Sequence, residues 1–497
     1  MSLKDRDDKR RFESSRERGR DVFNIAPTFF KFFGRLPMLV QRSVKISLPF
    51  VVLAIFTFVP MPVDIQIQHM LGIFLCIAML WTFGALPLPV TALLVPVLLT
   101  FYGIFPTDKA LTPFANPVVY LLMGGLIIAE AFRKHGIDRR LAYVLVSRFG
   151  GDIGKTLFSL MLVAAILSIW ISNTATTALL IPVVLGIASM AGQEKKRVAA
   201  LMLLGVGMGS AIGGMATITG SAPNAIVSGL LAERTSWTFL DWMKVGVPTS
   251  ITLLVIAWFV LLKTSPIRAK YLDIGAVKDG LKSMGPLSYG EKKTLGIFFP
   301  TVILWMAGAD IGALFGFPPS FMSATIVALS ASFLLFLTKT LDWEDTRSIS
   351  WDIFLVIGAG LALGEGMQFS GTAVWIANIL IGLTGGLHII VIMLAIITLT
   401  VALSNFMSNT ATVAILAPIL LGMSDALGID PKFLVLACGL SVALSFSTPI
   451  GTPPFTLIFS TGMVSKGEIA RCGLKVTLPA MIAILMIIYL LVSFDVV

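Results

Sequence analysis

Apolar runs recur along the whole chain, separated by shorter polar stretches. An α-helix needs about 20 apolar residues to cross the hydrocarbon core of a bilayer, so the runs leave room for roughly ten to twelve such helices. Several runs are shorter and are interrupted by glycine or proline. The pattern predicts an all-α polytopic membrane protein. The runs are Ile46–Val59, Met70–Phe83, Val118–Ala129, Leu157–Ile171, Ile251–Leu262, Ile326–Leu337, Ile389–Leu403 and Leu474–Val492.

The composition supports a membrane protein. Of the 497 residues, 56% are hydrophobic and 13% are charged, and the mean hydropathy is +0.92. Soluble domains carry about 25% charged residues, so this chain has too few charges to cover a water-exposed surface. Cys76, Cys438 and Cys472 form no CxxC pair, which indicates neither a disulfide framework nor a metal site.

An internal repeat divides the chain into two related halves. Residues 172–186 and 408–422 share 10 identities in 15 positions at an offset of 236, including the run Ser-Asn-Thr-Ala-Thr. Two further blocks match in the same order, which indicates a duplication. These blocks pair Gly125, Glu130 and Gly136 with Gly360, Glu365 and Gly371, and Gly220-Ser221-Ala222-Pro223 with Gly451-Thr452-Pro453-Pro454.

The repeat predicts two related membrane halves, 46–262 and 294–497, joined by a basic cytoplasmic linker, 263–293. Residues 1–45 are expected to form a disordered cytoplasmic tail, since the first 46 residues hold 12 basic and 6 acidic side chains. A nucleic-acid partner for this tail is not expected. The C-terminus carries no basic residue and is expected outside the cell. An odd number of spans in each half would make the repeat inverted.

The duplicated Ser-Asn-Thr lies inside apolar segments, where amides and hydroxyls need partners. One interpretation is that these side chains hold neighbouring helices together. The other, favoured by the duplication, is that each motif marks a helix break or a hairpin tip. Free N–H groups at such a break suit an anion, and carbonyl, hydroxyl and amide oxygens suit a hard cation such as sodium.

A second irregular segment follows each motif. Residues 213–224 contain three glycines and a proline, and residues 445–454 contain three prolines, so neither forms a continuous helix. A kinked helix inside the bundle is one interpretation. The other is unwound backbone that lines the same cavity as the Ser-Asn-Thr motifs, since irregular backbone is tolerated at membrane depth only there.

The segments SNTATTALLIPV, SNTATVAILAPI, ITGSAPNA and STPIGTPP resemble the divalent anion:sodium symporter family, over about residues 45–497. The resemblance implies a fold of eleven spans plus two re-entrant hairpins, each tipped by Ser-Asn-Thr. It also implies a homodimer in which a scaffold domain holds a transport domain that moves as an elevator. Members of the family carry dicarboxylates, tricarboxylates or sulfate.

The resemblance also implies two sodium sites around one substrate site. The sodium sites would use Ser168, Ser172, Asn173 and the backbone at Gly220, and Ser404, Ser408, Asn409 and the backbone at Gly451. The substrate carboxylates would contact Asn173, Thr174, Ser221, Asn409, Thr410, Thr452 and Pro453.

Two details of these motifs carry further expectations. The i, i+4 spacing predicts that Ser168 lies over Ser172, and Ser404 over Ser408, on one helix face. The second half has Phe455 where the first has Asn224, and this substitution is expected to reshape the substrate pocket.

We expect the charged and aromatic residues outside the repeated motifs to have structural roles. Glu130 and Glu365 are acidic residues in apolar surroundings. The functional hypothesis for them is proton coupling. The favoured interpretation is structural, an ion pair near the end of a membrane-spanning helix. The run from Arg133 to Arg140 is expected to begin an interfacial arm helix. Trp81 is assigned to an interfacial belt or to core packing.

The sequence predicts a sodium-coupled importer of C4-dicarboxylates such as succinate, fumarate and malate, in the cytoplasmic membrane, with sodium as coupling ion and no other cofactor. A sodium-independent exchanger of citrate, tartrate or 2-oxoglutarate, or a sulfate carrier, is the alternative within the same family. An intramembrane enzyme would need a nucleophile–base pair or metal ligands at bilayer depth, and the sequence offers neither. An ion channel would not need two motifs built for enclosed binding, so the motif pair argues against a channel.

Overall fold

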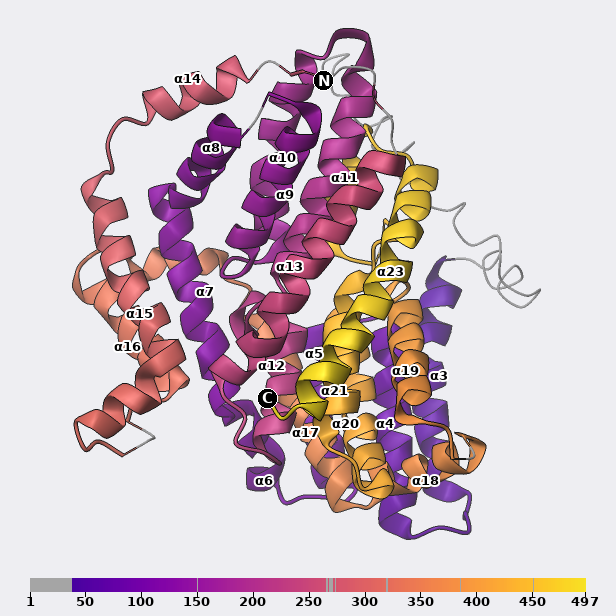
Figure 1. Cartoon of the computed structure of the whole chain (residues 1–497). Coiled ribbons are helices and arrows are strands. Elements are labelled where there is room, and N and C mark those ends of the chain that lie inside the picture. Colours follow the sequence, from indigo (N-terminus) through magenta and orange to yellow (C-terminus); the bar gives the residue numbers. More distant parts are fainter. Residues whose placement is uncertain are drawn as a thin grey trace.

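The computed structural model describes residues 38–149, 151–264, 267, 271–272, 274–318, 321–384, 386–449 and 451–497. These residues form a bundle of packed helices (Figure 1), which confirms the all-α prediction. Within them, nine helices are long and apolar enough to cross a membrane, and eight more apolar helices have 10–17 residues. Most of the predicted N-terminal tail, residues 1–37, lies outside the described ranges.

The first half comprises α3 (Met38–Phe58), α4 (Ile65–Phe83), α5 (Leu88–Phe101), α6 (Thr107–Leu111), η2 (Thr112–Ala115), α7 (Pro117–His135), α8 (Ile137–Phe149), α9 (Ile153–Ser168), α10 (Asn173–Ser189), η3 (Gly192–Glu194), α11 (Lys195–Gly213), η4 (Ile218–Gly220), α12 (Ala222–Ala232) and α13 (Phe239–Thr264). After α14 (Gly275–Ser283), the second half comprises α15 (Tyr289–Leu314), α16 (Ala324–Leu337), η5 (Trp343–Ser348), α17 (Asp352–Phe369), α18 (Thr372–Thr384), α19 (Ile389–Ser404), α20 (Asn409–Leu427), α21 (Pro431–Ser441), η6 (Val442–Leu444), α22 (Pro453–Ser460) and α23 (Lys466–Ser493).

The helices from α7 to α13 recur in the same order as α17 to α23, with opposite direction in the bundle. In Figure 1, α13 runs to the upper end, where α14 follows, whereas α23 ends at the C-terminus near the lower end. The α9–α10 hairpin likewise lies in the upper part of the molecule, and the α19–α20 hairpin lies in the lower part. The repeat is therefore inverted.

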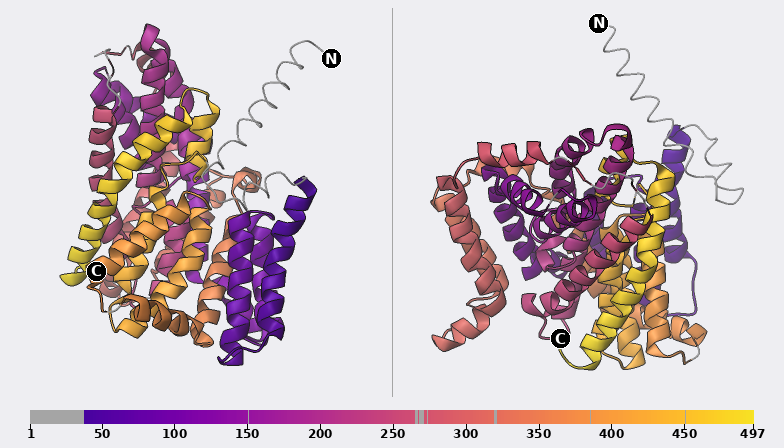
Figure 2. Two further views of the ribbon diagram at one scale, coloured as in Figure 1. Left: turned by 90° about the vertical axis from the view of Figure 1, so that its right-hand side faces the viewer. Right: turned by 45° about the horizontal axis from the view of Figure 1, so that its top comes forward.

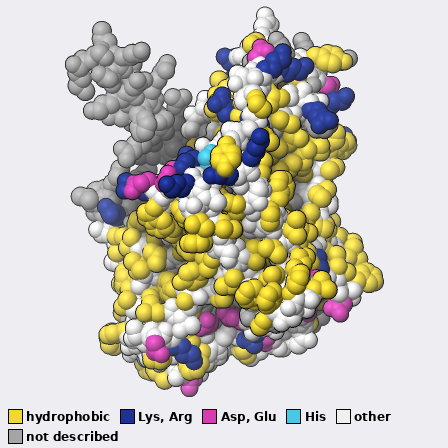
Figure 3. Space-filling model, turned by 90° about the vertical axis from the view of Figure 1, so that its left-hand side faces the viewer, with side chains coloured by type: hydrophobic (Ala, Val, Ile, Leu, Met, Phe, Trp, Pro, Cys, Tyr) yellow, Lys and Arg dark blue, Asp and Glu magenta, His cyan; other side chains and the backbone are white. Residues whose placement is uncertain are grey.

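The surface has the pattern of a membrane protein. On the face that carries α14, α15 and α16, hydrophobic side chains cover most of the middle, and charged side chains gather toward the two ends (Figure 3). On another side, α3, α4 and α5 stand together as a group, and α4 and α5 pack on α17 and α18 (Figure 2).

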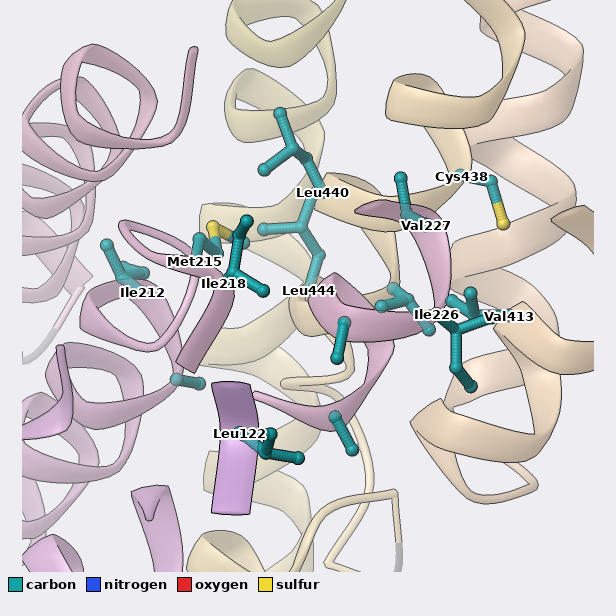
Figure 4. Packing of buried hydrophobic residues seen from close by; sticks show 14 of the residues in the cluster. Leu122, Ile212, Met215, Ile218, Ile226, Val227, Val413, Cys438, Leu440 and Leu444 are labelled. Carbon is teal, nitrogen blue, oxygen red and sulfur yellow. The ribbon is translucent and has the colours of Figure 1, made fainter. Parts of the chain in front are cut away.

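The core lies around the ends of the interrupted helices α11, α12 and α21. Figure 4 shows Ile212, Met215, Ile226, Leu440 and Leu444 converging there from the two halves, and all five side chains are buried. The loops that interrupt these helices therefore rest on tightly packed apolar side chains rather than on solvent.

The α9 hairpin helix packs very closely on α11 through glycines. Gly205, Gly209 and Gly213 lie one turn apart on α11, and a Cβ atom at Gly213 would be 2.2 Å from the carbonyl oxygen of Ala165 on α9. Small residues allow such close helix approach in membranes. This contact fixes the depth of the first hairpin against the first interrupted helix.

The segment predicted as a linker, 263–293, contains α14 and the first residues of α15. Arg140 on α8 holds it in place, because its guanidinium pairs with the Glu291 carboxylate and donates to the carbonyls of Met284, Gly285 and Pro286. The predicted arm helix that begins in the basic run corresponds to α8.

We expect Gly213→Ala to destabilise the protein by about 1–3 kcal/mol, because the added methyl group must push α9 away from α11. Gly296→Ala on α15 is the matched control, since a Cβ atom there has no heavy atom within 4 Å. Thermal unfolding of the detergent-solubilised protein measures both. Equal midpoints for the two variants would contradict the close α9–α11 contact.

Candidate substrate and cation site

Both Ser-Asn-Thr motifs form the tips of helical hairpins. Ser168 is the last residue of α9 and Ser172 is the N-cap of α10, with its Oγ accepting from the Ala175 N–H at 3.3 Å. Ser404 and Ser408 take the same places in α19 and α20. Serine is a preferred N-cap residue, so each motif starts the second helix of its hairpin.

The predicted stacking of Ser168 over Ser172, and of Ser404 over Ser408, on one helix face is wrong. In each pair, the first serine ends one helix and the second precedes the next, so a turn separates them. In the first hairpin, this turn brings the Ser168 Oγ to 2.5 Å from the Asn173 Oδ1, to which it donates. The turn thus brings these residues together by a route that the helical spacing does not describe.

The interrupted helices provide a second pair of loops, between α11 and α12 and between η6 and α22. Each loop is tied to the neighbouring hairpin tip by one threonine. Thr217 Oγ1 donates to the Ile169 carbonyl at 2.6 Å, and Thr448 Oγ1 donates to the Asn405 carbonyl at 2.7 Å. The same hydroxyls accept from the backbone N–H groups of Gly220 at 3.1 Å and Gly451 at 3.0 Å. The two hydrogen bonds to the hairpin carbonyls join segments about 45 residues apart in sequence, and the two from the glycine N–H groups hold each loop in shape.

The asparagine of each motif has a different partner in the two halves. Asn173 lies against Gly214, where a Cβ atom would be 2.4 Å from the Asn173 Oδ1. Asn409 instead accepts from the Ser445 Oγ at 3.2 Å. Ser404, the counterpart of Ser168, donates to the Val401 carbonyl of its own helix at 3.1 Å.

A cavity of about 660 Å³ lies between the two hairpin tips and the two loops. Every residue predicted to bind substrate lines it, Asn173 and Asn409 among them also being predicted to hold sodium, together with four further residues of the predicted sodium sets. These are Asn173, Thr174, Ser221, Asn409, Thr410, Thr452 and Pro453, and Ser172, Gly220, Ser408 and Gly451. Ser168 and Ser404 are not in the lining, and their side chains are fully buried.

Four helices begin at this cavity. The N-cap residues of α10, α12, α20 and α22 are Ser172, Ser221, Ser408 and Thr452, and each of them lines it. Among the described residues of the lining there is no lysine, arginine or histidine and no carboxylate. The positive field inside the cavity therefore comes from helix N-termini and backbone N–H groups, which favour an anion.

Helices also end beside the cavity. The carboxyl ends of α9 and α19, at Ser168 and Ser404, lie next to the motifs, and α11 ends at Gly213. Carbonyl, hydroxyl and amide oxygens at such ends suit a hard cation. A cation bound there would be adjacent to the anion-favouring N-termini.

The remaining wall comes from helices outside the hairpins and interrupted helices. Trp81 and Thr82 at the end of α4, Leu122 on α7 and Ile353 on α17 line the cavity. Thr82 Oγ1 lies 3.8 Å from the Met407 sulfur, next to the second motif. None of these residues was predicted at the site, because each one sits in an unmarked apolar run.

Phe455 is expected to reshape the pocket, but its side chain forms no part of the cavity wall. Its side chain is fully buried, does not line the cavity and stacks on Phe446 at a ring distance of 5.9 Å. Its counterpart Asn224 also lies outside the lining and donates to the carbonyls of Gly214 and Thr217, both at 2.7 Å. The substitution changes how the loop is supported, since an aromatic stack replaces two hydrogen bonds.

The repeat-matched acids lie outside the cavity lining. Glu130 pairs with Arg133 on the same helix and accepts from the Ser348 Oγ at 2.8 Å. This contact favours the interpretation of Glu130 as a structural ion-pair partner near the end of α7. Glu365 is half-buried on α17.

The profile of a family described as "Sodium:sulfate symporter transmembrane region" matches residues 40–494. The chain belongs to this family. The match confirms the resemblance to divalent anion:sodium symporters, whose members transport solutes rather than catalyse reactions.

The relatives agree with the family, and a solved structure agrees with the fold. An uncharacterized transporter of Methanocaldococcus jannaschii is 36% identical over 413 residues, 83% of this chain and 91% of the relative. A protein named sodium-dependent dicarboxylate transporter SdcS from Staphylococcus aureus is 30% identical over 444 residues, 85% of each chain. The Neisseria gonorrhoeae MtrF structure covers 91% of this chain and 95% of its own with a TM-score of 0.56 at 16% identity, which supports the fold alone.

The Trp81 indole provides a test of the cavity wall. Its Nε1 is buried and has no acceptor in the described part of the chain, whereas the equally buried Trp242 donates to the Met215 carbonyl at 2.9 Å. We expect Trp242→Phe to lower the free energy of unfolding by about 1–3 kcal/mol more than Trp81→Phe, because only Trp242→Phe leaves a buried carbonyl unpaired.

Thermal unfolding of the two variants without substrate measures this difference. A larger loss for Trp81→Phe than for Trp242→Phe would show that Trp81 makes a hydrogen bond in the substrate-free protein.

Proposed function

We propose that this transporter couples the import of C4-dicarboxylates, such as succinate, fumarate and malate, to the inward movement of sodium ions. The observation that carries this proposal is the convergence of four helix N-termini on one cavity whose described lining contains no basic side chain. A dianion there is stabilised by N–H groups, hydroxyls and amides, and its remaining charge is balanced by bound cations.

Each hairpin tip contributes one end of the substrate site. Asn173 and Thr174 bind one carboxylate, and Asn409 and Thr410 bind the other, with Ser221, Thr452 and Pro453 completing the cavity. Because the two tips approach from opposite ends of the bundle, they suit an anion with two separated carboxylates better than a compact sulfate ion.

Sodium ions occupy the two sets of oxygens beside the substrate. The first set comprises Ser168, Ser172, Asn173 and the Gly220 backbone, and the second comprises Ser404, Ser408, Asn409 and the Gly451 backbone. With further sodium, each cycle moves net positive charge inward. One such charge gains about 2.3 kcal/mol per 100 mV of membrane potential, enough to concentrate substrate many-fold.

The proposed working form is a homodimer in the cytoplasmic membrane, with the N-terminus inside and the C-terminus outside. The hairpins and interrupted helices form the transport domain, which moves as an elevator past a scaffold domain. This part of the proposal rests on the family resemblance. The wall formed by Trp81 and Ile353 then belongs to helices that the transport domain passes.

The sodium-dependent dicarboxylate transporters among the relatives favour this proposal over sodium-independent exchange. The structure adds a physical reason, since in the described lining no lysine or arginine stands in for a cation. Without bound cations, only the helix dipoles would balance the charge of a dianion in this cavity.

We expect uptake of labelled succinate into proteoliposomes to require an inward sodium gradient. Replacing sodium with choline should reduce uptake to the level of empty liposomes, because the substrate site lacks its counter-charges. Uptake that is equal in choline and sodium would exclude sodium coupling and favour exchange, which preloaded unlabelled dicarboxylate would then stimulate.

Ser168→Ala should raise the sodium concentration for half-maximal uptake about tenfold, since a polar contact to a charged group is worth about 1.5–3 kcal/mol. Ser159→Ala is the matched control on the same helix. Ser159 is also fully buried, but its hydroxyl donates to the Lys155 carbonyl, away from the cavity.

The comparison uses sodium titrations of succinate uptake by both variants. The assignment of Ser168 fails if the two variants have the same sodium dependence as the unsubstituted protein. Asn173→Ala, which removes a contact to both ligands, should abolish uptake while the protein still folds.

A further inference from the structure

A second cavity lies on the outer side of the first hairpin, away from the substrate site. It has a volume of about 380 Å³ and lies between α8, α10 and α14. Its residues are almost all apolar or glycine, with one phenol and one guanidinium. They are Arg139, Tyr143, Ala178, Leu179, Pro182, Val183, Gly186, Ile187 and Val277.

The floor of this cavity is one face of α10. Ala178, Pro182 and Gly186 follow each other at four-residue intervals, so they lie along one side of the helix, and all three are exposed. Half-buried Leu179 and Val183 flank them. The floor is an apolar groove along α10. The other face of α10 packs toward α11 and α22.

A single cation stands beside this apolar floor. The Arg139 guanidinium lies over the Tyr143 ring, 5.3 Å from its centroid, and donates to the Tyr143 hydroxyl at 3.2 Å. Among the described residues, no carboxylate is in ion-pair contact with it, whereas the adjacent Arg140 is paired with Glu291. The neighbouring Asp138 is buried and accepts from the Arg139 backbone N–H at 2.7 Å.

The charge around the cavity favours an anion. The described part of α14 adds Lys278 and Lys282 against one carboxylate, Asp279. This end of the molecule carries dark blue side chains above the hydrophobic band in Figure 3. Basic pockets between membrane helices bind anionic lipid head groups, with the acyl chain against apolar surface.

We propose that this cavity binds one anionic phospholipid. Its phosphate lies on the Arg139 guanidinium, and an acyl chain lies along Ala178, Pro182 and Gly186 on the back of the first hairpin. The bound lipid fills the space between the hairpin, α8 and α14, where α14 belongs to the segment between the two halves and α8 holds that segment in place. The proposal concerns binding alone and does not depend on the transported substrate.

A substitution at Gly186 can block the apolar groove on α10. A Cβ atom at Gly186 has no heavy atom within 4 Å, so a leucine side chain is expected to extend from this position into the space proposed for the acyl chain. Gly296 on α15 is the matched control, because it is also an exposed helical glycine with no neighbour within 4 Å of an added Cβ. Two substitutions of Arg139 distinguish its charge from its shape. Arg139→Gln removes the positive charge, and Arg139→Lys keeps the charge but not the planar guanidinium.

The test is native mass spectrometry of the full-length protein after incubation with equal amounts of phosphatidylglycerol and phosphatidylcholine. We expect one phosphatidylglycerol per chain to be retained in preference. Arg139→Gln should lower this occupancy about fivefold, the contribution of one cation near the membrane surface, and Arg139→Lys should preserve it. Gly186→Leu should remove the retained lipid, and Gly296→Leu should not.

Equal retention of the two lipids by the unsubstituted protein would overturn the proposal, and so would unchanged retention in both Arg139→Gln and Gly186→Leu. If Gly186→Leu fails to fold in a thermal-unfolding control, the comparison of retained lipid between Arg139→Gln and Arg139→Lys decides the test. Excess glycerol 3-phosphate should not displace the lipid; displacement would show a site for free phosphate esters.

Discussion

The structure depends on one constraint, that backbone N–H and C=O groups inside a bilayer must have partners. Two helices of this protein are interrupted at the centre of the bundle, and two hairpins turn there. Such irregular backbone is stable at membrane depth only where protein groups satisfy it or where it lines a cavity. Thr217 and Thr448 meet this requirement in the two halves, because each hydroxyl bridges a loop N–H to a carbonyl of a hairpin tip.

The same requirement explains why anion and cation sites are expected side by side. A hairpin turn at this depth places the end of one helix next to the start of another, so carbonyls and N–H groups become available within a few residues. Duplication and inversion bring two such turns to one cavity. The chain thereby gains a positively polarised site without any basic side chain in its described lining.

The two halves are related but they are not equivalent. In the first, Asn224 donates to two loop carbonyls. In the second, Phe455 stacks on Phe446, and Asn405 at the hairpin tip accepts from the Ser447 N–H at 3.0 Å. Polar support of the loop has moved from the interrupted helix to the hairpin. The loops are therefore supported differently around cavity linings that remain similar.

Much of the site could be predicted from the sequence, because polar residues repeated inside apolar segments are conspicuous. The duplicated Ser-Asn-Thr and the Gly- and Pro-rich blocks predicted the broken backbone, and the family resemblance that they carry implied the lining residues. The turn after Ser168 was missed, since Ile169, Trp170 and Ile171 give it an apolar, helix-like pattern. Trp81 and Ile353 could not be predicted at the cavity, because their positions depend on how distant helices pack.

The most direct test of the account measures succinate affinity as a function of sodium concentration at constant ionic strength. If cations in the two oxygen sets balance the dianion, each bound sodium strengthens succinate binding, and succinate strengthens sodium binding equally. We predict that the succinate dissociation constant falls with a limiting log–log slope of at least about two at low sodium, one for each proposed cation set and more if a further coupled sodium binds. A dissociation constant that does not change with sodium would contradict the central claim.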